Sequence, residues 1–282
     1  EVISARQEII LCQGAFGTPQ LLMLSGIGPA EHLRDHGIVP IVDLPGVGEN
    51  LADHVDVSIQ YGSHFAELSH ARHQRLDRAA MLMARWLMNG SGPGGGSLFS
   101  VVLFNAAGDR ELPETQVFMT PMIIDENLGN GGVEHTPLMQ RFGRGLLVRG
   151  RKVARPGVQI DINLERPKSL GTVRLRDANP VSHPAIDPNF LSSPQDIQEL
   201  VTAVKDMRTV MQQPQIAKYV TGEIGAWEGA QSDEEIVAAV RQTAYTGHHP
   251  CGTARMGHDN DAGAVLDSQL RVRGVHGLRV CD

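Results

Sequence analysis

The 282-residue chain has little of several features that define common protein classes. Its three cysteines, Cys12, Cys251 and Cys281, show no CxxC spacing. A disulfide framework or a cysteine-rich zinc site is therefore not indicated, and reduced thiols are expected. The net charge is −7 and no run of lysines or arginines is present, which disfavours a nucleic acid as partner. No apolar run approaches the length that spans a bilayer, so no membrane span is expected.

The chain contains 41% hydrophobic and 20% charged residues, a composition that is typical of a soluble globular protein with a hydrophobic core. The chain begins with Glu1 rather than methionine and stops at Asp282, directly after a strand-like run. We therefore expect an internal piece of a longer protein, whose targeting segments could lie outside it. A cytoplasmic location is the default expectation.

The first segment of the chain has the pattern of a strand followed by a helix. Residues 8–12 form a short apolar run, which predicts a buried parallel strand. A glycine turn follows at Gly14, and Thr18 with Pro19 predicts a helix N-cap and first helical position. Strand, turn and apolar helix form half of a βαβ unit, the usual location of nucleotide sites in α/β sheets.

The middle of the chain shows alternating patterns that favour antiparallel strands. Val55, Val57 and Ile59 alternate with polar residues. Further strands are expected at 100–104, 116–124, 158–164 and 171–175, and helices are expected after Ser193 and at the capping box of Ser232 and Glu235. The glycine-rich stretch 125–150 shows no regular period.

A methionine-rich amphipathic helix is predicted at residues 76–88. Its apolar side chains, Met81, Met83, Trp86 and Met88, favour core packing over a cofactor site. The following Gly90–Gly95 segment formally matches G-x-G-x-x-G. It is rejected as a dinucleotide fingerprint, because that motif needs a strand before it and a helix after it.

The most informative segment lies near the end of the chain, at residues 246–257. His249 is followed by Pro250, which fixes φ and removes a donor. Gly252 and Gly257 allow tight backbone paths near a ligand. An imidazole with an unperturbed pKa of about 6.5 can act as a base near neutral pH. A simple loop histidine is the alternative interpretation from these residues alone, and His248 is a second candidate base.

Several segments together resemble the glucose-methanol-choline (GMC) oxidoreductase family. Residues 14–29, GAFGTPQLLMLSGIGP, are similar to its second signature, and 44–54, LPGVGENLADH, to the loop that follows it. The other similar segments, in the same order as in the family, are 166–173, 184–191, 249–257, 270–272 and 277–282.

This resemblance implies an FAD enzyme that oxidises an alcohol to an aldehyde or ketone. In such enzymes a histidine at the position of His249 takes the hydroxyl proton while hydride passes to flavin N5, and His248 is less favoured. The implied fold is α/β plus α+β: an incomplete FAD-binding Rossmann-like domain with an antiparallel-sheet substrate domain. The predicted division is 1–55 and 236–282 for the FAD-binding domain and active site, and 56–235 for the substrate domain.

The resemblance also suggests three positions beside the flavin, Gly14, Asn50 and Asp282. A turn glycine and a loop-stabilising asparagine are nearly equal alternatives for Gly14 and Asn50. The family's G-x-G-x-x-G loop and second catalytic residue have no counterpart in this sequence. The chain alone is therefore not expected to bind FAD tightly or to turn over.

Other functions stay open from the sequence. A cyanohydrin lyase on the same fold would carry a similar base, and a catalytically silent fragment is a further alternative. A metal module at His248, His249, Cys251 and His258 is disfavoured, because the spacing fits no standard zinc pattern. The expected partners are a small-molecule alcohol and an electron acceptor, either oxygen or a quinone-linked carrier. Choline, long-chain alcohols and sugars are all open as substrates, although the low aromatic content (4%) disfavours choline.

Overall fold

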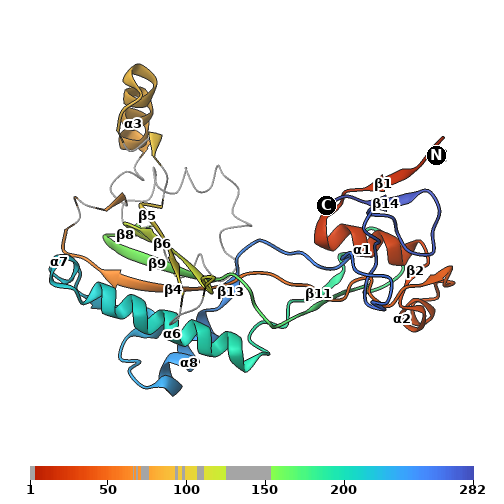
Figure 1. Ribbon diagram of the computed structural model, residues 1–282. Helices are drawn as coiled ribbons and strands as arrows, with labels where there is room; N and C mark the ends of the chain where they lie inside the picture. Colours follow the sequence, from red (N-terminus) through yellow and green to blue (C-terminus); the bar gives the residue numbers. More distant parts are fainter. Residues whose placement is uncertain are drawn as a thin grey trace. The chain divides into compact units, whose positions relative to one another are not determined.

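The computed structural model describes residues 4–65, 67, 69–70, 76–92, 95–96, 99–106, 111–124 and 154–282. It divides into two compact units (Figure 1). Unit 1 comprises Glu1–Val55, Pro167–Asp196 and Thr246–Asp282, and unit 2 comprises Asp56–Arg166 and Ile197–Tyr245.

These boundaries differ from the predicted division of the chain. The first break falls at Val55, next to the predicted one, but Pro167–Asp196 belongs to unit 1 rather than to the middle segment. The return to unit 1 comes at Thr246, ten residues after the predicted position 236. The reason is that β10 (Thr172–Arg174) is hydrogen-bonded to the loop of unit 1 that contains Gly48: the Val173 N–H donates to the Gly48 carbonyl at 2.7 Å. Strand β11 (Ala185–Asp187) follows β10 into unit 1 because the two strands pair.

Unit 1 begins with the predicted strand, glycine turn and helix. Strand β1 (Ile9–Leu11) pairs in parallel with β14 (Leu278–Val280), so the two ends of the chain lie side by side. The strand is not buried as predicted: Ile9 and Ile10 are 52% and 53% exposed. A parallel strand is normally covered on both faces, but the described sheet here has only these two strands.

The predicted start of the first helix was wrong. Helix α1 spans Gly14–Leu24, so that Thr18 and Pro19 lie inside it. Proline lacks an N–H and leaves the carbonyl four residues earlier without its helical donor. That carbonyl, on Ala15, instead accepts a hydrogen bond of 2.6 Å from the buried Thr253 hydroxyl. The proline thus creates a contact between the first helix and the C-terminal segment.

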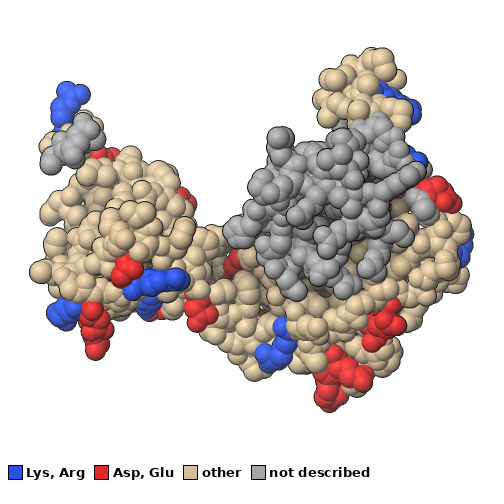
Figure 2. Space-filling view, turned by 180° about the vertical axis from the view of Figure 1, so that it is seen from behind, with Lys and Arg blue, Asp and Glu red and all other residues tan. Residues whose placement is uncertain are grey.

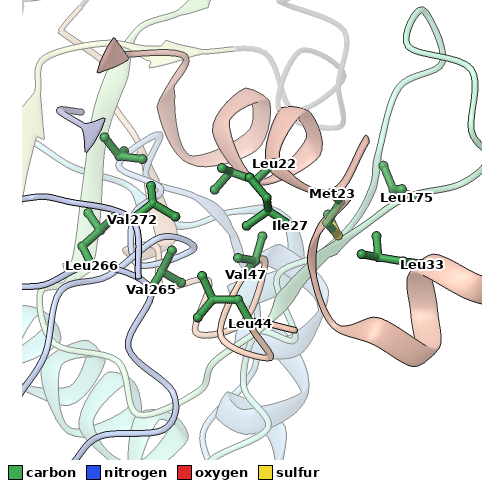
Figure 3. Close-up of a cluster of buried hydrophobic side chains, with 11 residues drawn as sticks. Leu22, Met23, Ile27, Leu33, Leu44, Val47, Leu175, Val265, Leu266 and Val272 are labelled. Atoms are coloured by element: carbon green, nitrogen blue, oxygen red, sulfur yellow. The ribbon is translucent and has the colours of Figure 1, made fainter. Parts of the chain in front are cut away.

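One hydrophobic cluster holds unit 1 together (Figure 3). It joins α1 to the short parallel pair β2 (Ile27–Gly28) and β3 (Val42–Asp43), to α2 (Ala30–Asp35), and to the C-terminal loops. Its members are Leu22, Met23, Ile27, Leu33, Leu44, Val47, Leu175, Val265, Leu266, Val272 and Val280. Residues far apart in the sequence therefore form a single core.

Unit 2 contains the predicted antiparallel sheet. Its strand order is β12-β4-β9-β6-β5, with β13 (Tyr245–Thr246) also pairing with β4. The strands are β4 (Val55–Gly62), β5 (Val101–Asn105), β6 (Thr115–Thr120), β9 (Gly157–Leu164) and β12 (Gly222–Glu223). Strands β7 (Ile123–Ile124) and β8 (Ala154–Arg155) form a separate antiparallel pair.

Helices pack on the apolar face of this sheet. Helix α6 (Pro194–Met211) buries Leu200, Val204 and Met207. Its Asp206 accepts from Asn105 at the end of β5 at 3.0 Å. Helix α8 (Asp233–Thr243) starts with the predicted capping box of Ser232 and Glu235, which the structure confirms. The short α7 (Pro214–Ala217) and the 3-10 turn Gly225–Trp227 connect these elements.

The methionine-rich helix forms, but its apolar side chains are not in the core. Helix α3 spans Leu76–Asn89, and Met81, Met83, Trp86 and Met88 are between 41% and 79% exposed. The expectation of core packing was therefore wrong. After the helix the chain continues to strand β5 without a further α-helix in the described residues, so the glycine segment lacks the strand before it and the α-helix after it that a dinucleotide fingerprint needs.

In Figure 2 basic side chains are scattered among acidic ones and form no continuous patch on the described residues. No helix in the described part of the chain is long and apolar enough to cross a membrane.

Candidate functional site

The segment that carries His249 is bonded to the loop before β4, and both belong to unit 1. Cys251 and Ala52 exchange two backbone hydrogen bonds of 2.8 and 2.9 Å, and Gly247 N–H donates to the His54 carbonyl at 2.9 Å. These bonds lie on either side of the histidine. The His249–Pro250 turn is therefore fixed to a second piece of backbone.

Asp53 is the residue that holds this turn, and the sequence interpretation missed it. Its carboxylate is 8% exposed and accepts from the His249 backbone N–H at 2.8 Å through Oδ1. Its other oxygen, Oδ2, accepts from the Thr246 hydroxyl. A charge-assisted acceptor for an N–H and an O–H is among the stronger hydrogen-bonding arrangements. The only signal in the sequence is an acidic residue two positions before the start of an apolar strand.

The two adjacent histidines have different environments. The His249 side chain is exposed and its ring lies 5.0 Å from that of His54, centroid to centroid, at 55°. His248 is also exposed, but its backbone is left-handed with φ of 63°. Asp53 bonds to the backbone of His249, and His248 N–H donates to the Thr246 hydroxyl at 3.0 Å. The geometry fixes the backbone of His249 directly and gives it an aromatic neighbour.

Asn50, a predicted flavin neighbour, shapes the same loop. Its backbone is left-handed, with φ of 58°. Its carbonyl oxygen faces Gly252 so closely that a Cβ on Gly252 would lie 2.2 Å from it. Gly252 itself has φ of 94°, which side chains rarely adopt. Gly252 is therefore required by both its own φ and its neighbour, and Asn50 has at least a structural role.

Gly14 and Asp282, the other two predicted cofactor positions, are hydrogen-bonded to each other. The Gly14 N–H donates to Asp282 Oδ2 at 2.8 Å, and the Thr18 hydroxyl donates to the same oxygen at 2.5 Å. A helix N-terminus attracts an anion, and here the Asp282 carboxylate occupies the start of α1. Gly14 has φ of 73° and open space where a Cβ would stand. The Asp282 Oδ1 atom accepts no hydrogen bond from the described residues.

A continuous set of contacts joins the four predicted site residues within unit 1. Asp282 bonds to the first turn of α1, whose Ala15 carbonyl bonds to Thr253. From Thr253 the chain passes through Gly252, beside Asn50, to His249. No group of three or more His, Cys, Asp or Glu side chains that could hold a metal ion occurs in the part of the chain that the structure describes.

A second polar cluster lies in unit 2, on the face of the sheet opposite the apolar residues. Asp161 Oδ1 accepts from Gln159 Nε2 at 2.8 Å, from the Tyr245 hydroxyl at 3.4 Å, and from the Ser58 hydroxyl. Burial raises the pKa of the Asp161 carboxyl above its usual range, although these three hydrogen bonds oppose the shift. Burial also raises the pKa of Tyr245, and the neighbouring Asp161 charge adds to that effect.

Comparison with known proteins decides the family. Two family models, both described as GMC oxidoreductase, match residues 1–56 and 167–282. The chain belongs to the GMC oxidoreductase family. The matched segments contain all four predicted site residues, and they cover all of unit 1 together with residues 197–245 of unit 2.

Curated relatives with similar sequences are oxygen-dependent choline dehydrogenases. The one from Klebsiella pneumoniae is 36% identical over 99% of this chain, and one from Escherichia coli is 35% identical over the same share. The chain spans about half the length of these curated relatives, 46% in both cases.

Among solved structures, formate oxidase from Aspergillus oryzae, studied for the modification of its FAD, matches with a TM-score of 0.78 and 27% identity. The match covers 99% of this chain and 49% of that protein. The fold is thus a partial, mixed α/β GMC fold that includes an antiparallel sheet. FAD is the cofactor of the family.

Proposed function

We propose that the protein oxidises an alcohol to an aldehyde or ketone with bound FAD, and that His249 is the base that takes the hydroxyl proton. The observation that carries this proposal is that the Asp53 carboxylate accepts a hydrogen bond from the backbone N–H of His249, which lies in a segment matched by the GMC family model. An alkoxide is a far better hydride donor than a neutral alcohol, so a positioned base accelerates the reaction by roughly 10²–10⁴-fold.

The exposed imidazole of His249 is suited to this role because a substrate can reach it. Asp53 is 8% exposed and bonds to the backbone of the turn. We assign Asp53 as a positioning residue: it holds the turn through the His249 N–H and the Thr246 hydroxyl, and leaves the His249 ring available for the proton.

The residues at the start of α1 can contact one edge of a bound cofactor, but they do not form a complete binding site. FAD, when bound, supplies the hydride acceptor. Asp282 Oδ1 accepts nothing from the described residues and is exposed, so it can accept from a cofactor hydroxyl or N–H. The Gly14 N–H is already bonded to Asp282, which makes Gly14 a residue that orients the carboxylate. Asn50 supports the loop that carries His249.

The visible spectrum tests the redox assignment directly. The protein produced from its native gene is purified and its flavin absorption recorded before and after anaerobic addition of a panel of alcohols. A flavin band that one alcohol bleaches is the expected result, and the product aldehyde or ketone should form in equal amount.

A cyanohydrin lyase on the same fold gives a different outcome. Its flavin would stay oxidised with every alcohol while a cyanohydrin is cleaved to a carbonyl compound. A protein without flavin, or with a flavin that no alcohol reduces, would contradict the proposed oxidation.

A further inference from the structure

Two of the three cysteines meet at the parallel pair of strands in unit 1. Leu11 and Val280 are the last residues of β1 and β14 that pair, and Cys12 and Cys281 directly follow them. The Cys281 N–H donates to the Leu11 carbonyl at 2.9 Å, which carries the parallel ladder one residue beyond the last pair. Cys12 and Cys281 are therefore neighbours, although they lie far apart in the sequence.

A second hydrogen bond fixes the other side of this cysteine pair. Two residues after Cys12, the Gly14 N–H donates to the Asp282 carboxylate at 2.8 Å. Asp282 directly follows Cys281 in the chain. The cysteine pair is thus enclosed between a backbone bond on one side and a backbone-to-carboxylate bond on the other. The two segments must therefore run alongside each other where the thiols stand.

The spacing of adjacent strands suits a disulfide bond. Neighbouring strands lie about 4.8 Å apart, and disulfides join residues whose Cα atoms are about 4.4–6.8 Å apart. Side chains that stand opposite each other in adjacent strands point to the same face of the sheet, so the two thiols share one face. Both Cys12 and Cys281 are free and exposed, and an oxidant can therefore reach them.

Cys251, the third cysteine, has no such neighbour. It is also free and exposed, but the residue that stands opposite it is Ala52, in the loop before β4. The chain thus contains one cysteine pair and one isolated cysteine. Oxidation can join the pair, whereas it can only add oxygen to the isolated thiol or link it to another molecule.

We propose that Cys12 and Cys281 are a site of reversible oxidation, at which hydrogen peroxide converts the two thiols to a disulfide between the ends of β1 and β14. The thiolate of one cysteine attacks a peroxide oxygen, the O–O bond breaks, and the sulfur becomes a sulfenic acid while water leaves with the thiol proton. The thiol of the other cysteine then attacks that sulfur, the S–S bond forms, and a second water leaves. Two thiols and one peroxide thus give one disulfide and two waters.

The disulfide would add a covalent link beside the start of α1. In the reduced protein the Gly14 N–H and the Thr18 hydroxyl hold the Asp282 carboxylate by hydrogen bonds alone. The new bond also closes a loop that contains nearly all of the 282 residues, and in the chain-entropy account the stabilisation grows with loop length. Oxidation should therefore raise the temperature at which unit 1 unfolds. The site does not rest on the proposed function.

Peptide mapping after oxidation tests the proposal. The protein produced from its native gene is reduced with dithiothreitol, freed of the reductant and treated with hydrogen peroxide, and the remaining thiols are alkylated before digestion. We expect a linked pair of peptides that contains Cys12 and Cys281, lighter by two hydrogen atoms than the separate thiol peptides. Dithiothreitol should separate the pair again. Cys251 should be found alkylated or as an oxygen acid of sulfur, and not linked.

Cys12→Ser and Cys251→Ser are the matched variants, since each replaces one exposed thiol by a hydroxyl of similar size. In Cys12→Ser the oxidised Cys281 has no partner and should remain a sulfenic acid, which dimedone labels. Cys251→Ser should form the disulfide as the native protein does. Peroxide should raise the unfolding temperature of the native protein and of Cys251→Ser by several degrees, with no rise in Cys12→Ser.

Three results would overturn the proposal. They are oxygen acids at both Cys12 and Cys281 without a link between them, two thiols that peroxide leaves unchanged, and a link from either one to Cys251. None of these results bears on the reduction of the flavin by an alcohol. Failure of the disulfide to form would therefore leave the proposed function intact, and a flavin that no alcohol reduces would leave this site intact.

Discussion

The two units of the chain fix their polar groups in different ways. In unit 1 the candidate site consists of loops, whose backbones are bonded to each other and to buried carboxylates such as Asp53. In unit 2 the polar groups stand on adjacent strands, and their neighbours follow from the pairing of the sheet. A site made of loops depends on particular backbone conformations, whereas a site on a sheet depends on register.

The largest stability effect is expected in unit 2, at a partly buried ion pair that links α6 to the sheet. Arg208 donates to both oxygens of Glu223 at 2.8 and 2.7 Å, and the two side chains are 13% and 14% exposed. Arg208→Met leaves the Glu223 carboxylate partly buried with only the Tyr61 hydroxyl as donor, and should cost about 3 kcal/mol of unfolding free energy or somewhat more. Denaturant unfolding measures this loss.

The control for that prediction lies on the same helix. Lys205 pairs with Asp233 at 2.5 Å, but both side chains are largely exposed, so Lys205→Met should cost less than about 1 kcal/mol. Equal losses for the two variants would show that burial does not decide the contribution of these pairs.

A smaller but still large effect is expected at the backbone of unit 1. Gly252→Ala places a Cβ 2.2 Å from the Asn50 carbonyl at a φ of 94° and should cost about 3 kcal/mol. Gly37→Ala, at a φ of 71° with nothing within 4 Å of its Cβ, should cost about 1 kcal/mol. Amide hydrogen exchange of Gly252→Ala should show reduced protection in unit 1 and unchanged protection in unit 2. An equal loss of protection in both units would contradict the expectation that the substitution destabilises unit 1 alone.

Loss of one of the two hydrogen bonds that Asp53 accepts should affect catalysis more than stability. Asp53→Asn keeps one acceptor and loses the other, which costs about 1–3 kcal/mol. Because the His249 turn loosens, kcat for the alcohol should fall while KM changes little. Asp43→Asn is the control, since Asp43 Oδ1 accepts from the Ala30 N–H at 3.0 Å elsewhere in unit 1. An unchanged kcat in Asp53→Asn would contradict the positioning role.

The smallest predicted effect is a pH dependence in unit 2. Burial raises the folded-state pKa of Asp161, so the folded state holds this proton more tightly than the unfolded one. Its contribution to stability is complete below the unfolded pKa of about 3.9 and is lost as pH rises through the folded value. Asp161→Asn cannot ionise. Denaturant unfolding should therefore show the variant gaining stability relative to the native protein as pH rises above about 4, and a constant difference would contradict this sign.

The sequence was sufficient for features that depend on neighbours along the chain. The capping box of Ser232 and Glu235 was predicted because both residues lie in one turn. The predicted start of α1 was wrong because the Thr18 hydroxyl donates to a distant residue, Asp282, and does not cap the helix. Core packing of α3 was wrong because amphipathicity does not specify a partner, and its methionines are exposed.

The candidate site was predictable only in part, for the same reason. His249, Gly14, Asn50 and Asp282 lie in segments that resemble a known family. Asp53 was missed because its role depends on a residue 196 positions later. Asp161 alternates with apolar residues in the sequence, but nothing there shows that Ser58 and Tyr245 meet it across strands.

The rate of anaerobic flavin reduction by the best alcohol tests the central claim most directly, with variants of the two adjacent histidines. His249→Asn removes the proposed base and should lower the rate roughly 10²–10⁴-fold. His248→Asn keeps a residue that tolerates the left-handed backbone and should stay within about threefold of the native rate, since it removes no base. A large loss in His248→Asn with little change in His249→Asn would contradict the account.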